Sequence, residues 1–407
     1  MDAHGRTRAT ELNAVTTFLD MAADQQGSPQ TSPHSSTQAT QPGPLAGLTF
    51  AVKDVIDVAG VPTSMGSNVT VPGTQPATTS AALVTQLTSL GAVAVAKTNC
   101  QEFSHGILGD VSVFGRVVNP VDPALCTGGS SSGSAALVGA GVVDFALGTD
   151  TAGSVRVPAA CCHVTGFKPT FGVLPVDGIF PLSPTFDTAG LFAREPELVA
   201  RVFSALTGQA VAPAPDQPRI GFVDARGTIR SVTGYLPDAH NLTASGEELF
   251  AHAAGVYDVV RKFESARIHR EFMESQADAY QPAILAKFRD AEGVSEEDYR
   301  RGLAQVTQLQ KRAAEVFASV DFIVTPAVDG PLATWEQVDS DPGVRGAYMH
   351  YSQPFNVLGW PAVVVPLSTR DEAGHPQSIQ IVAHPAKDSE LLAFATAFAG
   401  SVKSRTE

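Results

Sequence analysis

Short apolar runs alternate with amphipathic stretches along most of this chain. LTFAVKDVIDV indicates a strand closed by the turn residues Gly60 and Pro62, SAALVTQLTSLGA indicates an amphipathic helix, and VAVAK indicates a short buried strand. SAALVGAGVVDFALGTD indicates a small-residue helix followed by a strand. Towards the C-terminus DFIVTPA, PAVVVPL and QSIQIVA are strand-like, and SELLAFATAFAG is helical, with Ser389 near its cap. This rhythm predicts an α/β fold with one large sheet and helices on its faces.

Three regions depart from this rhythm. The first segment spaces apolar side chains at helical intervals, which predicts a helix from about Thr10 to Ala23 within an N-terminal arm, residues 1–23. Residues 24–44 are nearly devoid of large apolar side chains and cannot offset their own ordering entropy, so we expect a flexible linker. We expect residues 45–407 to form a single domain, with a charged and mostly helical region around residues 210–320 that breaks near Gly293.

Charge and hydropathy narrow the classes of partner. The 407 residues carry a formal net charge of −14, and an acidic surface repels phosphate backbones and anionic lipid headgroups. We therefore expect no nucleic-acid and no membrane partner. The N-terminal stretch MDAHGRTRATEL has no apolar core of a signal peptide, and no run approaches the roughly 18 apolar residues of a membrane helix, so a cytoplasmic location is expected.

The four cysteines give no metal or redox pattern. Cys100, Cys126, Cys161 and Cys162 form no CxxC pair, and His163 lacks a second ligand cluster at zinc-site spacing. We expect buried or half-buried thiols, no metal site and no cofactor.

Two segments are rich in glycine and serine within apolar surroundings: CTGGSSSGS, residues 126–134, and GTDTAGSVR, residues 148–156. Each alone fits a capped turn that leads into a helix. Neither has the lysine of a phosphate-binding loop. The first also fits a nucleophile elbow, with Ser131 attacking and His375 or His384 as base, although the two prolines just before it disfavour the buried strand that an elbow needs.

Together with the lysine of FAVKD, these two segments resemble the amidase signature family. GPLAGLTFAVKDVIDVAGVPT, AVAKTNCQEF, FGRVVNP, GFKPTFGVLP, SPTFDTAGLFAR, DFIVTPA and FNVLGWPAVVVP follow in the family's order, most weakly between residues 210 and 315. The compact length and the sequences of these segments most resemble the short branch of the family that contains the plant indole-3-acetamide hydrolases. The resemblance implies the amidase signature fold, with one large mixed β-sheet flanked by helices on both faces.

The resemblance also implies a catalytic relay of Lys53, Ser130 and Ser154. Ser154 is the implied nucleophile, and the family spacing selects Ser130 as the intermediate serine over Ser131 or Ser132. The peptide before Ser130 is cis in the family. A serine needs a base as it attacks, and lysine can be that base only when burial keeps its amine neutral.

Further residues take implied roles around this relay. The implied oxyanion donors are the backbone N–H groups of Thr151, Ala152, Gly153 and Ser154, although Ala152 replaces the usual glycine and would be strained at a positive φ. The implied supporting residues are Asp150, Arg156, Asp187 and Thr188. The implied substrate-binding residues are Phe103, Ser104, His105, Gly106, Gly128 and Gly129, with looser pocket candidates in Phe171, Phe180, Phe355 and Trp360.

The activity implied is hydrolysis of the C–N bond of a small aryl, indolyl or aliphatic amide, through an acyl-enzyme and with water as co-substrate. Three alternatives stay open at this point: a carbamate, urea or ester hydrolase of the same family, a non-catalytic amidase-like scaffold, and a subunit of a tRNA-dependent amidotransferase. A homodimer is also left open.

Overall fold

An eleven-stranded mixed sheet forms the centre of the molecule. The computed structural model describes residues 1–19, 43–227 and 238–404. The strands are β1 (Val15–Phe18), β2 (Thr49–Lys53), β3 (Val93–Thr98), β4 (Phe145–Asp150), β5 (Thr165–Lys168), β6 (Thr188–Ala193), β7 (Ile220–Phe222), β8 (His240–Asn241), β9 (Phe322–Pro326), β10 (Ala362–Arg370) and β11 (Pro376–Ala383). Their order across the sheet is β1-β3-β2-β4-β6-β5-β10-β11-β9-β7-β8. The pair β2–β4 is parallel and β4–β6 is antiparallel, so the predicted mixed α/β sheet is confirmed.

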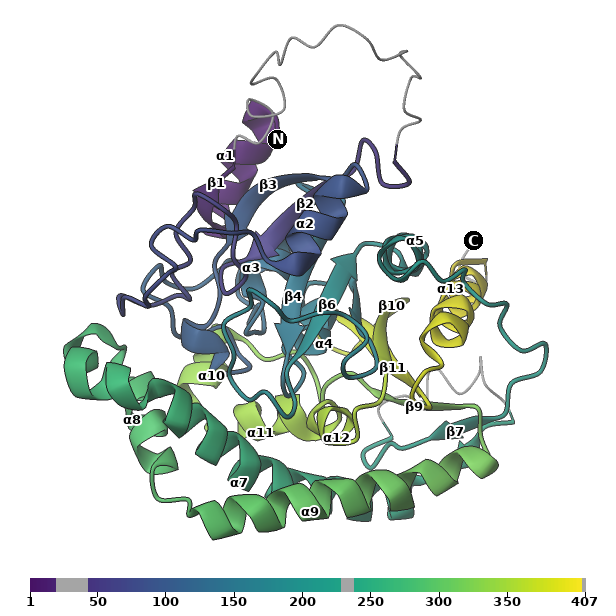
Figure 1. Ribbon diagram of the computed structural model, residues 1–407. Helices are drawn as coiled ribbons and strands as arrows, with labels where there is room; N and C mark the ends of the chain where they lie inside the picture. The colour runs from purple at the N-terminus through teal and green to yellow at the C-terminus, as the bar shows by residue number, and fades with distance from the viewer. Residues whose placement is uncertain (20–42, 228–237, 405–407) are drawn as a thin grey trace, which may run out of the picture.

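Helices cover the sheet on both faces (Figure 1). They are α1 (Ala3–Glu11), α2 (Ala82–Ser89), α3 (Ser132–Gly139), α4 (Arg156–Cys161), α5 (Pro196–Thr207), α7 (Thr243–Gln276), α8 (Pro282–Ala291), α9 (Glu296–Ala313), α10 (Trp335–Ser340), α11 (Gly343–His350), α12 (Gln353–Val357) and α13 (Asp388–Ser404). Short 3₁₀ helices lie at η2 (Glu102–Ser104), η3 (Ala277–Ala279) and η4 (Ala314–Ala318).

The alternation of side chains along the strands sorts the core into two layers. Phe50 and Val52 of β2 belong to one apolar cluster, together with side chains of α2, α5 and α13. Ala51, between them, belongs to a second cluster with α3 and α4. Buried small residues of α3 such as Ala135 and Ala136 allow this helix to pack close to the sheet, which brings the start of α3 beside the ends of β2 and β4.

The charged middle of the chain forms three helices that extend along one side of the body. The expected break at Gly293 is confirmed, since it lies between α8 and α9. A second break, which the pattern did not predict, falls at η3 and Pro282. The helices α7 and α9 contact each other along their length, and α7 also packs on α12 (Figure 1).

The N-terminal segment differs from the sequence expectation. The helix expected from Thr10 to Ala23 is wrong: α1 ends at Glu11, and Val15–Phe18 forms β1, antiparallel to β3. Asn13, at φ 52°, turns the chain between the two, and the β-branched stretch VTTF pairs with a strand that a local pattern does not reveal. The linker expected over residues 24–44 lies outside the described residues apart from Gly43 and Pro44, and the division into arm and domain stays a prediction.

None of the helices in the described ranges combines the length and the apolar character required to cross a membrane.

Candidate active site

Lys53 lies at the C-terminal end of β2 and is fully buried. Its Nζ makes three hydrogen bonds to hydroxyl oxygens, at 2.6 Å to Ser130, 2.6 Å to Thr149 and 3.0 Å to Ser104. Burial lowers the pKa of Lys53 to about 8, although nearby Cys100, Asp187 and Asp150 act in the opposite direction. The amine therefore loses its proton far more readily than a lysine in water, while the surrounding hydroxyls hold its nitrogen in place.

Ser130 belongs to the glycine-rich loop before α3, and the Gly129–Ser130 peptide is cis. Two glycines let this loop pack directly against other backbone. A Cβ at Gly128, where φ is 70°, would lie 2.9 Å from the Cα of Pro158, and a Cβ at Gly129 would lie 2.5 Å from the backbone nitrogen of Gly109. Neither glycine lines the cavity at Ser154, and the implied substrate-binding role of Gly128 and Gly129 stays a prediction.

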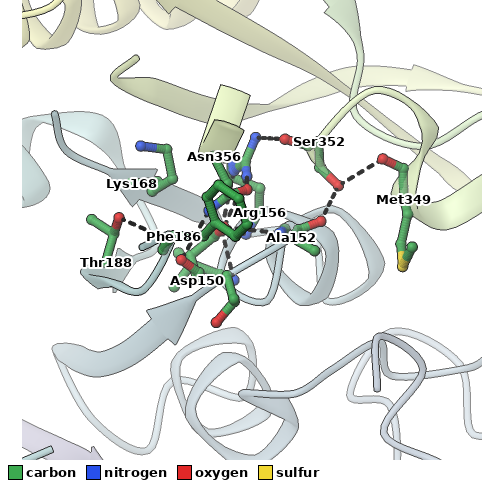
Figure 2. Close-up of polar contacts among 12 residues, drawn as sticks. Asp150, Ala152, Arg156, Lys168, Phe186, Thr188, Met349, Ser352 and Asn356 are labelled. Carbon is green, nitrogen blue, oxygen red and sulfur yellow. Dashed lines mark hydrogen bonds and ion pairs between the residues drawn. The ribbon is translucent and has the colours of Figure 1, made fainter. Parts of the chain in front are cut away.

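Ser154 follows β4 in the loop that leads into α4. The loop depends on a glycine at 153 rather than at 152. Gly153 has φ 120°, and a Cβ there would lie 2.2 Å from Ser352 Oγ, whereas Ala152 has a negative φ. The strain considered for Ala152 therefore does not arise. The Ser352 hydroxyl instead donates a 2.6 Å hydrogen bond to the carbonyl of Ala152 (Figure 2).

A buried ion pair between Asp150 and Arg156 holds the two ends of this loop. Arg156 Nη2 lies 2.8 Å from Asp150 Oδ1, and both side chains are fully buried. The guanidinium uses its remaining donors on Asn356 of α12 and on the carbonyl of Ser352, just before α12 (Figure 2). It also donates to the side-chain oxygen of Gln380 in β11. Burial alone would raise the pKa of the Asp150 carboxyl, but Arg156 holds it below its usual value, so the carboxylate stays ionised. The two side chains thus form an ion pair, while the supporting role that the resemblance implies for them stays a prediction.

The same carboxylate decides which backbone N–H groups remain for an oxyanion. Asp150 accepts hydrogen bonds from the N–H groups of Gly153, at 2.8 Å, and Val155, at 3.1 Å. The N–H of Gly153 is thus occupied, which removes it from the four expected donors. Within the described residues, the N–H groups of Thr151, Ala152 and Ser154 have no acceptor.

Asp187 braces the other side of the loop. Its Oδ1 accepts a 2.6 Å hydrogen bond from the Thr151 hydroxyl, and its Oδ2 accepts from the backbone N–H groups of Leu182 and Ser183, both at 2.9 Å. Burial raises the pKa of Asp187. Thr188 begins β6, and its backbone is paired with that of Asp150. Asp187 and Thr188 thus both contact the segment of residues 150–151.

Ser154 reaches a cavity of about 210 Å³. Ser104, His105 and Gly106 line this cavity as expected, together with Thr151 and Ala152. The main chain of Ser154 is joined to the Ser130 loop by a 3.3 Å hydrogen bond from Ser131 N–H to Ser154 C=O. The Ser130 hydroxyl is bonded to Lys53 in this structure, and within the described ranges it makes no hydrogen bond with the Ser154 hydroxyl.

The expected aromatic wall is largely absent from this cavity. Phe103 is buried in an aromatic cluster with Phe180, His269, Tyr280 and Phe288. Phe180 lines an adjoining cavity of about 250 Å³ that it shares with Ser104. Phe355 and Trp360 line a separate cavity, and Phe171 is exposed, so the structure does not bring these three residues to the Ser154 cavity.

The alternative of a nucleophile elbow is not supported. Ser131 is fully buried, and its hydroxyl bonds to the backbone of Thr149 at 3.3 Å. Neither candidate base contacts it: His384 bonds to the carbonyl of Pro385, and His375 lies beside Asp371 in the turn between β10 and β11.

All four cysteines are buried and unpaired, as expected. Across residues 1–19, 43–227 and 238–404, no group of three His, Cys, Asp or Glu side chains is arranged to hold a metal ion.

Several cavity residues escaped sequence reasoning. Thr149 bonds to Lys53, and four cations line the cavity beside Ser154: Arg261, Lys262, Lys287 and Arg345. Thr149 lies one residue before Asp150, within the glycine- and serine-rich segment 148–156, so its position in that segment could have marked it as a site residue. The cations come from three separate helices, and no local pattern distinguishes them from solvated charge.

Comparisons with known proteins match nearly the whole chain to amidases and related enzymes. The Amidase family model matches residues 6–230 and 239–392. The chain is 29% identical to the A subunit of glutamyl-tRNA(Gln) amidotransferase from Symbiobacterium thermophilum, over 95% of this chain and 89% of that protein. It is 31% identical to 2-amino-5-chloromuconic acid deaminase of Comamonas testosteroni, over 87% of this chain and 81% of that protein. A crystal structure described as an amidase has a TM-score of 0.86 and 27% identity, covering 98% of this chain and 95% of that one.

Proposed function

The chain belongs to the amidase family of hydrolases that act on carbon–nitrogen bonds, and we propose that it hydrolyses a small amide through a relay of Lys53, Ser130 and Ser154. The observation that carries this proposal is the 2.6 Å hydrogen bond between Lys53 Nζ and Ser130 Oγ, made by a fully buried amine whose pKa burial lowers to about 8. A substantial neutral fraction at ordinary pH is what a lysine base requires.

The proposed reaction has two halves. In the first, the neutral amine of Lys53 takes the proton of Ser130, Ser130 takes that of Ser154, and Ser154 Oγ bonds to the amide carbonyl carbon. When the tetrahedral intermediate collapses, the C–N bond breaks and the proton returns through Ser130 to the leaving nitrogen. In the second half, water attacks the ester at Ser154 through the same proton path and releases the acid.

Backbone groups stabilise the charge that develops on the carbonyl oxygen. The N–H groups of Thr151, Ala152 and Ser154 have no acceptor in the described part of the chain, and they belong to a loop held by Asp150 and Asp187. Donors that are already held in place cost little reorganisation as the negative charge forms.

The hydrogen bond between Ser130 and Ser154 is proposed to form when substrate is bound. Catalytic hydrogen bonds in ligand-free enzymes are often long or poorly aligned and tighten in the complex. The backbone link from Ser131 to Ser154 supports this step, because it keeps the two serine loops adjacent.

A second candidate is a role within a multi-subunit amidotransferase, favoured by the 29% identity to a protein of that kind over 95% of this chain. The two candidates share the amide-cleaving half-reaction and differ in whether the chain acts alone. Hydrolysis of amides by the purified chain favours the free-standing enzyme. Amide cleavage that appears only with partner proteins favours the second candidate. Carbamates, ureas and esters belong in the same substrate panel.

The deciding experiment pairs Ser154→Ala with Ser131→Ala. We expect Ser154→Ala to lose at least about 10³-fold in kcat/KM, as removal of a catalytic serine does elsewhere, and to lose labelling by a fluorophosphonate. Peptide mapping of the labelled wild-type protein should identify Ser154. Circular dichroism and thermal melts check that both variants fold. Labelling at Ser131, or wild-type turnover by folded Ser154→Ala, would overturn the mechanism.

A further inference from the structure

Four cations line the cavity that Ser154 reaches, although the chain as a whole carries a formal charge of −14. Arg261 and Lys262 come from α7, Lys287 comes from α8 and Arg345 comes from α11. The proposed relay uses none of them. Three helices that are separate in sequence thus place positive charge at one cavity. Solubility alone does not explain why these cations gather at the cavity rather than on the open surface.

Three aspartates neutralise part of this charge. Arg261 pairs with Asp258 at 2.6 Å, and Arg345 pairs with Asp110 at 2.9 Å. Lys262 lies 3.3 Å from Asp258 and 2.8 Å from Asp290.

Lys287 is the cation of this group that takes part in none of these ion pairs. Its Nζ donates a 3.0 Å hydrogen bond to the backbone carbonyl of His105, and no carboxylate of the described residues pairs with it. The pKa of Lys287 is lowered to about 8, chiefly by burial and also by the cations of Arg345 and Arg261, while Asp110 acts in the opposite direction. An anion in the cavity would relieve both the burial of this charge and the repulsion among its neighbours.

Two buried nitrogens nearby also lack acceptors. Arg345 Nη1 and His105 Nδ1 have no hydrogen-bond partner among the described residues. His105 Nε2 lies 2.9 Å from Arg261 Nη1, and because a guanidinium can only donate, Nε2 must accept. The imidazole of His105 is neutral, since burial and the cations around it hold its pKa well below the usual value, so its proton sits on Nδ1. Buried donors without partners are costly, and a bound acceptor would satisfy them.

We infer that the amide substrate also carries a carboxylate, which Lys287 and Arg345 bind while the amide carbonyl lies at Ser154. This inference rests on the proposed function and specifies its substrate class. Apolar side chains complete the cavity wall and suit a short methylene chain between the two polar ends: Ile107, Leu182, Tyr257 and Met349. At about 210 Å³ the cavity is smaller than the roughly 300–1,000 Å³ of drug-sized sites, so the substrate is a short one.

The substrate class is therefore the monoamide of a short dicarboxylic acid. Its hydrolysis consumes one water, breaks the C–N bond, and yields the dicarboxylate and ammonia. Succinamate and succinamide form a matched test pair, because they differ chiefly in whether the distal group is an anionic carboxylate or a neutral amide. Malonamate with malonamide, and glutaramate with glutaramide, test chain length.

The experiment measures kcat/KM for each pair with the full-length protein. We expect at least about a ten-fold preference for the anionic member, the size of one charge-assisted hydrogen bond. Lys287→Met and Arg345→Met should each reduce this preference about ten-fold. Lys311→Met, at an exposed lysine of α9, serves as the matched control and should leave the preference unchanged.

Succinate provides a second readout that does not depend on turnover. It should inhibit the wild type competitively, and calorimetry should show that it binds the wild type more tightly than Lys287→Met. Equal turnover of charged and neutral amides, with no succinate binding, would overturn this inference and leave the amidase proposal standing. Folded wild-type protein that cleaved no member of any pair would overturn both.

Discussion

Gly153 and Ser352 are packed so closely that a β-carbon at position 153 would lie 2.2 Å from Ser352 Oγ and 2.6 Å from Ser352 Cβ. The same hydroxyl donates to the carbonyl of Ala152 at 2.6 Å. Contact with Ser352, the residue just before α12, therefore fixes the loop on both sides of the peptide that joins Ala152 to Gly153. The unusual alanine of this loop occupies a position that tolerates a side chain, and the glycine after it occupies one that does not.

This relationship predicts that two adjacent substitutions destabilise the fold to different extents. Gly153→Ala introduces both an overlap with Ser352 and a side chain at φ 120°, and should reduce the free energy of unfolding by about 1–3 kcal/mol. Ala152→Gly only adds backbone freedom and should cost no more than about 1 kcal/mol. Urea titrations followed by fluorescence measure both. Equal destabilisation by the two variants would show that position 153 is not the constrained one.

The lowered pKa of Lys53 predicts how activity depends on pH. If the neutral amine is the base, activity requires the deprotonated form, so kcat/KM should fall as the pH drops below about 8 and level off above it. Stopped assays from pH 6 to 10, with a neutral amide, measure this limb. A neutral substrate is needed because Lys287, which lines the cavity, also has a pKa lowered to about 8.

Lys53→Met is the control for that profile. The methionine side chain has similar length but cannot accept a proton, so the residual rate should be far lower and should not rise between pH 7 and 9. A folded Lys53→Met protein that kept the wild-type profile would assign the titration to another group. A wild-type rate that did not change from pH 6 to 9 would exclude Lys53 as the base.

The residues that sequence reasoning found are those whose chemistry depends on type and spacing. The family resemblance assigned roles to Lys53, Ser130, Asp150 and Arg156, and each belongs to a short segment that matches a family motif. In the structure Lys53 bonds to Ser130, and Asp150 pairs with Arg156. The strands β2, β3, β4, β9, β10 and β11 were found because their apolar runs are local.

What sequence reasoning missed depends on contacts between distant segments. Val15–Phe18 satisfies a helical spacing, but pairing with β3 decides its conformation. β5 and β6 contain Gly166 and Gly190, so neither shows the alternation that marks a strand. Lys287 and Arg345 reach the Ser154 cavity only because α8 and α11 fold against it, and each looks like an ordinary surface charge in its own segment.

The buried pair of Asp150 and Arg156 should contribute more to stability than an exposed pair of the same geometry. Asp150→Asn leaves the Arg156 guanidinium buried without its counter-charge, and loss of one partner of a buried pair typically costs about 3–5 kcal/mol. Arg219 and Asp321 form a comparable pair at 2.7 Å on the surface, and Asp321→Asn should cost about 1 kcal/mol or less. Urea unfolding of the two variants, at low and at high salt, gives the comparison. The effect of Asp321→Asn should diminish with salt, while that of Asp150→Asn should persist, because ions do not reach the buried site. Similar small losses in both variants would mean that the loop around Ser154 is held by the hydrogen bond from the Thr151 hydroxyl to Asp187 and that from Ser352 to the Ala152 carbonyl, rather than by the ion pair.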